Sequence, residues 1–341
     1  MQLQLRRRTI QRIQTFVWFA AVYGVIGFFW EYIEAGRVTL GGVGTGIPIG
    51  LVFALMEEVQ IARFTRSMSF SAAVLAKSFV YLGVIAIPIM LTGFVFGFVA
   101  GLEPSDFIAW VTSFEFVVDL VLILLIHTVV IFGRNVSRLL GPGTLMRYIV
   151  GRYHRPRLEN RVFMFLDLKS STMLAEKLGA EQYFSFLNDV FRHISEPILD
   201  YAAEIYQYVG DEVILTWPIN DGLRNANCVL VFVEILTEIH SRREHYLQTY
   251  GYVPEFKAGV HFGEVVTAEI GDIKKDIAYS GDVLNTAARI QSKCNELGQS
   301  LIASSELVSA LELPEFIRPR ELGFVELRGK AEATSLVGLL A

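Results

Sequence analysis

Long apolar runs dominate the first 132 residues of the chain, whereas the remainder alternates short apolar runs with polar segments. Four early runs are long enough to cross a bilayer as helices, at residues 14–30, 38–56, 79–100 and 107–132. Lysine and arginine are frequent before the first run, between the second and third, and after the fourth, but the other two connections contain only Arg37. Because positive residues beside spans favour the cytoplasmic side, the pattern predicts a multi-pass inner-membrane protein with both termini in the cytoplasm.

Polar residues inside these runs are candidates for sensing. The fourth run contains Glu115 and Asp119, one helical turn apart, and also His127. Acids are costly inside a bilayer and usually face a bundle interior or water. We therefore expect the two acids to sense an unidentified ligand, proton or ion, with a structural polar contact as the alternative. The glycines that crowd the second run favour tight helix packing over a ligand cleft.

Composition narrows the class of protein. The 52% hydrophobic content and mean hydropathy of +0.43 are high for a soluble protein and favour a membrane part. The net charge of −5, with no basic stripe interleaved with aromatic residues, gives no indication of nucleic-acid binding. Cys228 and Cys294 are the only cysteines, which excludes a disulfide framework or thiolate metal cluster and predicts reduced thiols.

The second half contains two acids at the ends of apolar runs. One run ends at Asp167 and is followed by three hydroxyl residues, so it predicts a buried strand, a turn and a capped helix. A helix start attracts polyphosphate, and a carboxylate beside it can hold Mg²⁺. The stretch 204–217 predicts two strands joined at Gly210-Asp211. Such pairs also mark turns for conformational reasons alone, but two acids on neighbouring strands can share a pair of hard cations.

A third stretch places an amide and a guanidinium on one helix. Gly281 precedes an apolar, small-residue pattern with Asn285 and Arg289 four positions apart, hence on one face. These groups can stabilise charge that develops on a phosphate, and a solvated face with an Arg salt bridge is the alternative.

The remaining pattern predicts an α+β arrangement. Helical spacing covers 181–201 and 226–250, a hairpin of 255–262 and 265–270 turns at Gly263-Glu264, and short strands lie at 300–303, 324–327 and 336–339. His261, beside that turn, is expected to be structural. Residues 133–158 contain Gly141-Pro142-Gly143 and several arginines, which indicates a linker that breaks the preceding helix or contacts anionic headgroups.

Taken in order, the three stretches resemble the catalytic domain of class III adenylate and guanylate cyclases over roughly residues 159–341. That family has a Phe-x-Asp strand followed by small hydroxyl residues, a Gly-Asp hairpin and an Asn-x-x-x-Arg helix, all present here. The resemblance implies a ferredoxin-like α+β core. The expected architecture is a four-helix transmembrane bundle over 1–132, a cytoplasmic coupling linker over 133–158 and a nucleotidyl cyclase domain over 159–341.

The resemblance also implies roles for individual residues. Asp167 and Asp211 would bind two Mg²⁺ or Mn²⁺ ions, Asn285 would position the ribose, and Arg289 would stabilise charge at the α-phosphorus. The backbone of Leu168, Lys169, Ser170, Ser171 and Thr172 would cradle the phosphates, and Lys330 would contact the terminal phosphates, with Arg328 as its rival. Family sites form between two subunits, which implies a homodimer.

Two positions depart from the family pattern that selects adenine. Gln207 stands where these members have Lys, and Ala278 where they have Asp or Thr; guanylate cyclases place Glu and Cys there. A Gln amide both donates and accepts, so it can match adenine but also guanine or a pyrimidine. We favour ATP as substrate, with GTP, CTP and UTP as alternatives.

Other classes of protein remain for comparison. The altered base-reading pair favours a membrane receptor whose cyclase-like domain binds nucleotide without turnover, although such a scaffold has no need of both acids with Asn285 and Arg289. A transporter is less favoured because no inverted repeat is evident. A diguanylate cyclase is less favoured because its Gly-Gly-Asp/Glu signature is absent.

Overall fold

The computed structural model describes residues 7–36, 41–59, 68–99, 103–140, 144–327 and 333–340. The chain divides into two compact units, Met1–Leu140 and Gly141–Ala341, so the division falls inside the predicted linker. Each unit is described by itself.

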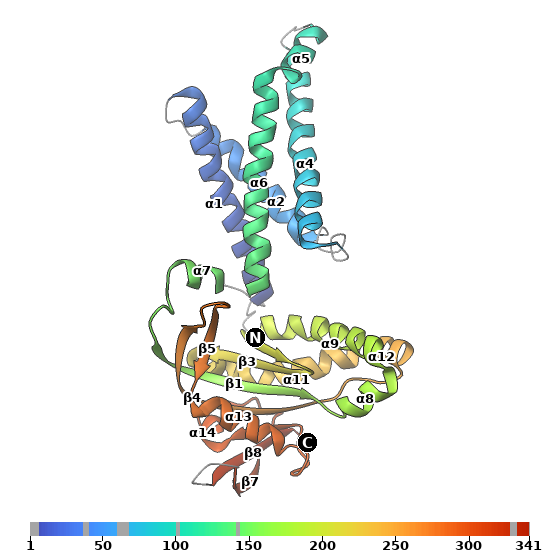
Figure 1. Cartoon of the computed structure of the whole chain (residues 1–341), viewed down its shortest axis with the longest axis vertical. Helices are drawn as coiled ribbons and strands as arrows, with labels where there is room; N and C mark the ends of the chain where they lie inside the picture. Colours follow the sequence, from blue (N-terminus) through green and yellow to red (C-terminus); the bar gives the residue numbers. More distant parts are fainter. Residues whose placement is uncertain are drawn as a thin grey trace. The chain divides into compact units, whose positions relative to one another are not determined.

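The first unit is helical (Figure 1). Its helices are α1 (Arg7–Ala35), α2 (Gly41–Val59), α4 (Phe70–Val99), α5 (Pro104–Val111) and α6 (Phe114–Leu140). Within the described ranges, Arg12–Ile33 and Phe114–Ser137 are long and apolar enough to cross a membrane, while the apolar stretches Gly46–Met56 and Ser71–Val84 are shorter. The prediction that one span begins at Phe107 is wrong, because α5 is a separate short helix that ends at the C-cap Thr112.

Close helix packing at glycines is confirmed in this unit. A Cβ added at Gly46 would lie 2.1 Å from the carbonyl oxygen of Tyr23, and one added at Gly50 would lie 2.5 Å from that of Phe19. One buried polar centre of this unit is His127, which hydrogen bonds to Tyr23 and packs against the rings of Phe53 and Tyr81.

The two acids predicted to sense a ligand do not share that buried centre. The side chain of Glu115 is exposed and that of Asp119 is half-buried. His127, by contrast, is only 2% exposed.

The second unit contains an eight-stranded mixed sheet in the order β2-β3-β1-β4-β6-β8-β7, with β5 paired to the end of β4. The strands are β1 (Arg157–Leu168), β2 (Glu204–Val209), β3 (Glu212–Pro218), β4 (Phe256–Ile270), β5 (Asp276–Ser280), β6 (Leu301–Ser304), β7 (Arg320–Val325) and β8 (Thr334–Leu340). The helices are α7 (Thr144–Ile149), α8 (Ser171–Leu178), α9 (Ala180–Asp200), α10 (Ile219–Leu223), α11 (Asn227–Ser241), α12 (Arg243–Tyr250), α13 (Asp282–Ser292) and α14 (Ser305–Ser309), with the 3₁₀ turn Arg224–Ala226 before α11.

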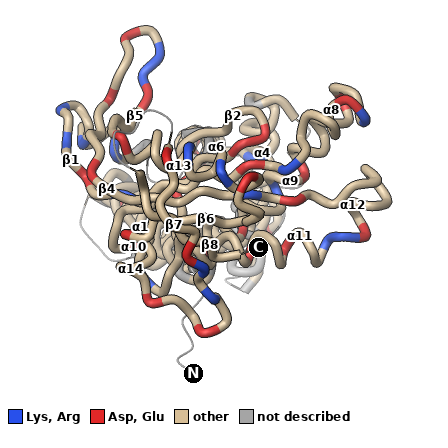
Figure 2. The backbone as a smooth tube through the Cα atoms, turned by 90° about the horizontal axis from the view of Figure 1, so that it is seen from below, with Lys and Arg blue, Asp and Glu red and all other residues tan. Residues whose placement is uncertain are grey.

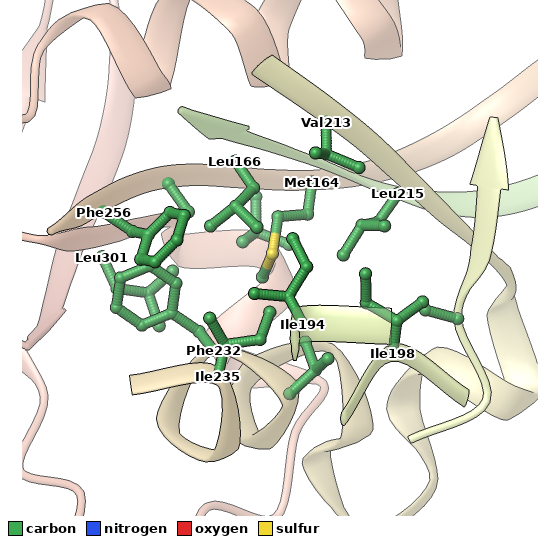
Figure 3. Packing of buried hydrophobic residues seen from close by; sticks show 14 of the residues in the cluster. Met164, Leu166, Ile194, Ile198, Val213, Leu215, Phe232, Ile235, Phe256 and Leu301 are labelled. Carbon is green, nitrogen blue, oxygen red and sulfur yellow. The ribbon is translucent and has the colours of Figure 1, made fainter. Parts of the chain in front are cut away.

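Alternation along β1 builds a core on each face of this sheet. Val162, Met164 and Leu166 point to the face covered by α9 and α11, where the large core lies (Figure 3). Phe163 and Phe165 point to the opposite face, which is covered by α13. The two cores therefore hold β1, β3 and α13 in a fixed arrangement.

Lys and Arg positions are interspersed with Asp and Glu along the backbone (Figure 2).

The predicted hairpin at Gly263-Glu264 is wrong. β4 runs unbroken through these residues because Gly263 pairs with Arg161 and Glu264 with Asn160 in the ladder with β1. The chain turns after Ile270, where Gly271 adopts a φ of +87°, a value that favours glycine. The helix predicted over 226–250 is two helices, α11 and α12, which are separated at Arg242.

Candidate active site

The structure brings Asp167 and Asp211 to the same end of neighbouring strands. β1 pairs antiparallel with β3, and the register ends at Leu166 opposite Val213. Asp167 continues β1 beyond this pair, while Asp211 lies in the two-residue turn before β3. Gly210 forms the first half of this turn with a φ of +64°, which is why glycine is suited to the position. The predicted hairpin is therefore confirmed.

Negative charge is crowded at this end of the sheet. Burial raises the pKa of Asp211, and the charge of Asp167 raises it further, while the nearby Ser171 hydroxyl opposes the shift. Burial, with Asp167 and Asp211 beside it, raises the pKa of Glu212 to about 7. Oδ2 of Asp211 is buried and has no hydrogen-bond partner among the described residues. A bound cation would relieve both the repulsion and the unpaired oxygen.

The donor set fits Mg²⁺ or Mn²⁺ bound together with phosphate. No group of three or more His, Cys, Asp or Glu side chains in the described ranges could hold a metal ion by itself. Mg²⁺ in phosphate-transfer sites is commonly held by one or two carboxylates, with phosphate and water oxygens completing the shell. Asp167 and Asp211 supply the carboxylates that such a site requires.

Two contacts of Asp167 were not predicted from the sequence. Nε2 of Gln291 donates to Oδ2 of Asp167 at 2.8 Å, and Nζ of Lys257 lies 3.1 Å from the same oxygen. Lys257 is directly opposite Asp167 in the β1–β4 ladder. Gln291 approaches from α13. These contacts join three separate elements, so no local sequence pattern indicates them.

The segment after Asp167 differs in detail from the prediction. Ser170 is the N-cap residue of α8, but it adopts a left-handed conformation (φ 59°) and its side chain makes no capping hydrogen bond. The amide of Lys169 donates to the carbonyl of Glu255 at 2.8 Å, and Leu168 remains in the β1–β4 ladder. Of the segment predicted to cradle phosphate, Leu168 and Lys169 are therefore already engaged in the sheet, while Ser170 to Thr172 lie at the start of α8.

The predicted pair Asn285 and Arg289 lies on α13, which packs on the sheet through Val283 and Ala287. Asn285 is exposed, and Nη1 of Arg289 is buried without a hydrogen-bond partner in the described part of the chain. No hydrogen bond or ion pair among the described residues joins this pair to Asp167 or Asp211. One chain therefore contains both sets without connecting them directly.

The two predicted base-reading positions lie on different strands. Gln207 is exposed on β2, and Ala278 is half-buried on β5. Their neighbours Tyr206 and Tyr279 pack edge to face, with ring centroids 4.9 Å apart. Lys330 and its rival Arg328 lie outside the described residues. His261 is buried and hydrogen bonded to Ser304 at 2.8 Å, as expected for a structural histidine.

A buried ion network also lies in this unit. The Arg161 side chain is 3% exposed and contacts Glu159 at 3.2 Å and Glu204 at 2.6 Å. Arg147, on α7, pairs with the same Glu204. Burial alone would raise the pKa of Glu204, but the hydrogen bond from Arg147 and the charge of Arg161 lower it overall. The network ties α7 to the β2–β3 hairpin that carries Asp211.

Comparison with known proteins gives a consistent result. Residues 154–337 match the family described as Adenylate and Guanylate cyclase catalytic domain. Adenylate cyclase 2 of Rhizobium meliloti (strain 1021) is 36% identical over 212 residues, which are 62% of this chain and 58% of that protein. Adenylate cyclase 1 of the same strain is 28% identical over 183 residues, 51% of this chain and 26% of that protein. The chain thus spans little more than half of the first relative and about a quarter of the second.

A solved structure shares the fold. The structure of a bacterial light-regulated adenylyl cyclase aligns with a TM-score of 0.57 at 19% identity, covering 67% of each chain. This likeness supports the α+β arrangement of the second unit.

Proposed function

Because the chain belongs to the family of class III adenylate and guanylate cyclase catalytic domains, we propose that it is a membrane-bound adenylate cyclase, a lyase that converts ATP to 3′,5′-cyclic AMP and pyrophosphate. The observation that carries this proposal is the meeting of Asp167 and Asp211 at adjoining strand ends, where a buried carboxylate oxygen lacks a partner. A nucleotide-binding scaffold without turnover has no need of this crowded charge.

Cyclases of this family generally use divalent cations, and Asp167 and Asp211 are the residues that would hold two Mg²⁺ or Mn²⁺ ions here. When bound, such cations activate the ribose 3′-hydroxyl and neutralise charge on the triphosphate. The backbone amides from Ser170 to Thr172, at the start of α8, donate to phosphate oxygens.

Asn285 orients the ribose, and Arg289 stabilises the charge that develops at the α-phosphorus as pyrophosphate leaves. The buried, unpaired Nη1 of Arg289 is suited to a phosphate oxygen supplied from outside its own chain. This feature supports a homodimer in which the acids of one subunit act with Asn285 and Arg289 of the other. In the same proposal, Lys330 contacts the terminal phosphates.

ATP is the favoured substrate because the Gln207 amide can donate to and accept from the Watson–Crick edge of adenine. Ala278 contributes no polar side-chain group, so Gln207 would be the main residue that selects the base. The curated relatives named above are adenylate cyclases, which supports the same choice.

The first unit is proposed to anchor the enzyme in the inner membrane, with the catalytic unit in the cytoplasm. Support comes from the two described stretches that are long and apolar enough to cross a bilayer. The four-span arrangement and regulation by an unidentified membrane ligand belong to the same proposal.

The test is product formation by the full-length protein in membranes with Mn²⁺ and each of ATP, GTP, CTP and UTP. Cyclic AMP is expected, and Asp211→Asn should lower its rate by at least about 100-fold because a cation ligand is lost. The matched control Asp272→Asn, at an exposed position, should retain the wild-type rate. A different cyclic nucleotide would overturn the substrate, and no product from any triphosphate would favour the scaffold.

A further inference from the structure

Gln291 makes a contact that the proposed reaction does not explain. Its side chain is buried, at 6% exposure, and Nε2 donates to Oδ2 of Asp167 at 2.8 Å. Gln291 lies two positions after Arg289 on α13, whereas Asp167 lies at the end of β1. A buried amide of this kind has few alternative orientations, so the contact restricts the rotation of the Asp167 side chain.

The backbone around this contact is fixed closely. Gly259 on β4 lies so near to α13 that a Cβ added there would be 2.2 Å from the backbone nitrogen of Gln291 and 2.5 Å from the carbonyl oxygen of Ala287. The position of Gln291 is therefore set by direct packing of helix backbone on the sheet. On the other side of the contact, Asp167 is held in the β1–β4 ladder opposite Lys257.

Lys257 contacts the same carboxylate oxygen. Its Nζ is 3.1 Å from Oδ2 of Asp167, and its side chain is 16% exposed. An ammonium group supplies charge but has little directional preference, whereas an amide donates along a defined direction. With both donors on Oδ2, the second oxygen, Oδ1, is left for other ligands.

We propose that Gln291 is a positioning residue of the cation site, which holds Asp167 by Oδ2 so that Oδ1 is presented to the divalent cation. This inference rests on the proposed function, because it takes Asp167 as a cation ligand. The amide adds no charge, so it orients the carboxylate without weakening its attraction for a cation. Outer contacts of this type commonly change metal affinity by about 10- to 100-fold when they are removed.

The same helix carries Asn285 and Arg289. One rigid element therefore sets the direction of a cation ligand and the position of the pair that acts on the nucleotide. In the proposed homodimer, α13 would contribute Gln291 to the site of its own subunit and Asn285 with Arg289 to the other.

The experiment measures Mn²⁺ affinity of the full-length protein in detergent, from the electron paramagnetic resonance signal of free Mn²⁺. Gln291→Met keeps the side-chain length and removes the donor, so the dissociation constant should rise by about 10- to 100-fold. The matched control is Gln299→Met, at an equally buried glutamine that donates to the Gly298 carbonyl, and its affinity should stay within about twofold of wild type. At saturating Mn²⁺ the cyclisation rate of Gln291→Met should recover most of its loss, which a merely structural defect would not show.

Wild-type Mn²⁺ affinity in Gln291→Met, alongside weakened affinity in Asp167→Asn, would overturn the inference while leaving Asp167 as a ligand. Unchanged Mn²⁺ affinity in Asp167→Asn would overturn both the inference and the assignment of Asp167 as a cation ligand. The cyclase activity is tested separately, by product formation in the wild type. If Gln291→Met fails to fold, Gln291→Asn takes its place. That shorter amide cannot reach Oδ2, so its dissociation constant should also rise, and an unchanged value would count against the proposal.

Discussion

The close approach of α13 to β4 gives a sharp test of how this fold positions its chemistry. Gly259 pairs with Phe165 in the centre of the sheet, on the strand face covered by α13. In Gly259→Ala, the new methyl group would meet Gln291 N at 2.2 Å, Ala287 O at 2.5 Å and Gln291 Cα at 2.7 Å. All three are backbone atoms of α13, so no side-chain rotation can relieve the overlap.

The required displacement can be estimated from these distances. Ordinary contacts of a Cβ begin at 3.4 Å, so α13 must move by about 1.2 Å, since backbone atoms cannot be compressed. A misplacement of about 1 Å can cost about 100-fold in rate, and α13 carries Asn285, Arg289 and Gln291. Overpacking of this kind also costs about 1–3 kcal/mol of folding free energy, which lowers the unfolding midpoint by roughly 2–12 °C for a unit of this size.

The assay is the initial rate of cyclic AMP formation in membranes at saturating Mn²⁺, together with the thermal unfolding midpoint. Gly263→Ala is the matched control, since it lies four residues along the same strand face and its methyl would meet only Val283 Cγ2, at 2.8 Å. This contact involves one side-chain methyl and no backbone atom of α13, so the control should lose less rate than Gly259→Ala. A wild-type rate and midpoint in Gly259→Ala, or equal damage in both variants, would refute the reasoning.

Two further predictions concern the pH dependence of stability. Arg147 and Arg161 together outweigh burial and lower the pKa of Glu204, so this carboxylate stabilises the fold at neutral pH and the contribution is lost as pH falls through its depressed pKa. In urea unfolding at pH 7, Glu204→Gln should lower the free energy of unfolding by about 1–3 kcal/mol. The difference from wild type should shrink in acid, and a difference independent of pH would contradict the prediction. Burial, with Arg242 and Arg192 nearby, lowers the pKa of His193 to about 4, so the folded state resists protonation and stability falls as pH drops from about 6.5 toward 4. His193→Gln should flatten that slope in midpoint-against-pH curves, and parallel curves would exclude the effect.

The features that sequence predicted correctly depend on local chemistry. The strand that ends at Asp167, the hairpin at Gly210-Asp211 and the helix with Asn285 and Arg289 are each specified within about a dozen consecutive residues. Their apolar period and turn residues agree with the final structure, so the local pattern is sufficient. Local pattern does not show that the strands of Asp167 and Asp211 are neighbours; the pairing of β1 with β3 in the structure shows it.

The errors arise where tertiary contacts outweigh local preference. Gly263-Glu264 has turn-forming composition, yet pairing with Asn160 and Arg161 on β1 keeps β4 extended through it. The contact of Gln291 with Asp167 spans 124 positions, and the Lys257 contact requires the β1–β4 register. Neither has a local signal. The missed residues, Gln291 and Lys257, are therefore ones whose contacts depend on the tertiary fold, whereas the motifs identified from the sequence are local.

Two buried atoms connect the geometry of one chain to the proposed assembly. Oδ2 of Asp211 and Nη1 of Arg289 both lack hydrogen-bond partners among the described residues, and they carry opposite charge. A buried charged group without a partner is costly, so each atom favours a ligand that supplies the missing interaction. Under the proposed function, this ligand is a cation for Asp211 and a phosphate oxygen for Arg289. A nucleoside triphosphate with its divalent cations carries both, and in a homodimer one such ligand would satisfy the acid of one subunit and the guanidinium of the other. The unpaired atoms of a single chain therefore agree with the proposed homodimer, in which each atom meets the ligand from a different subunit.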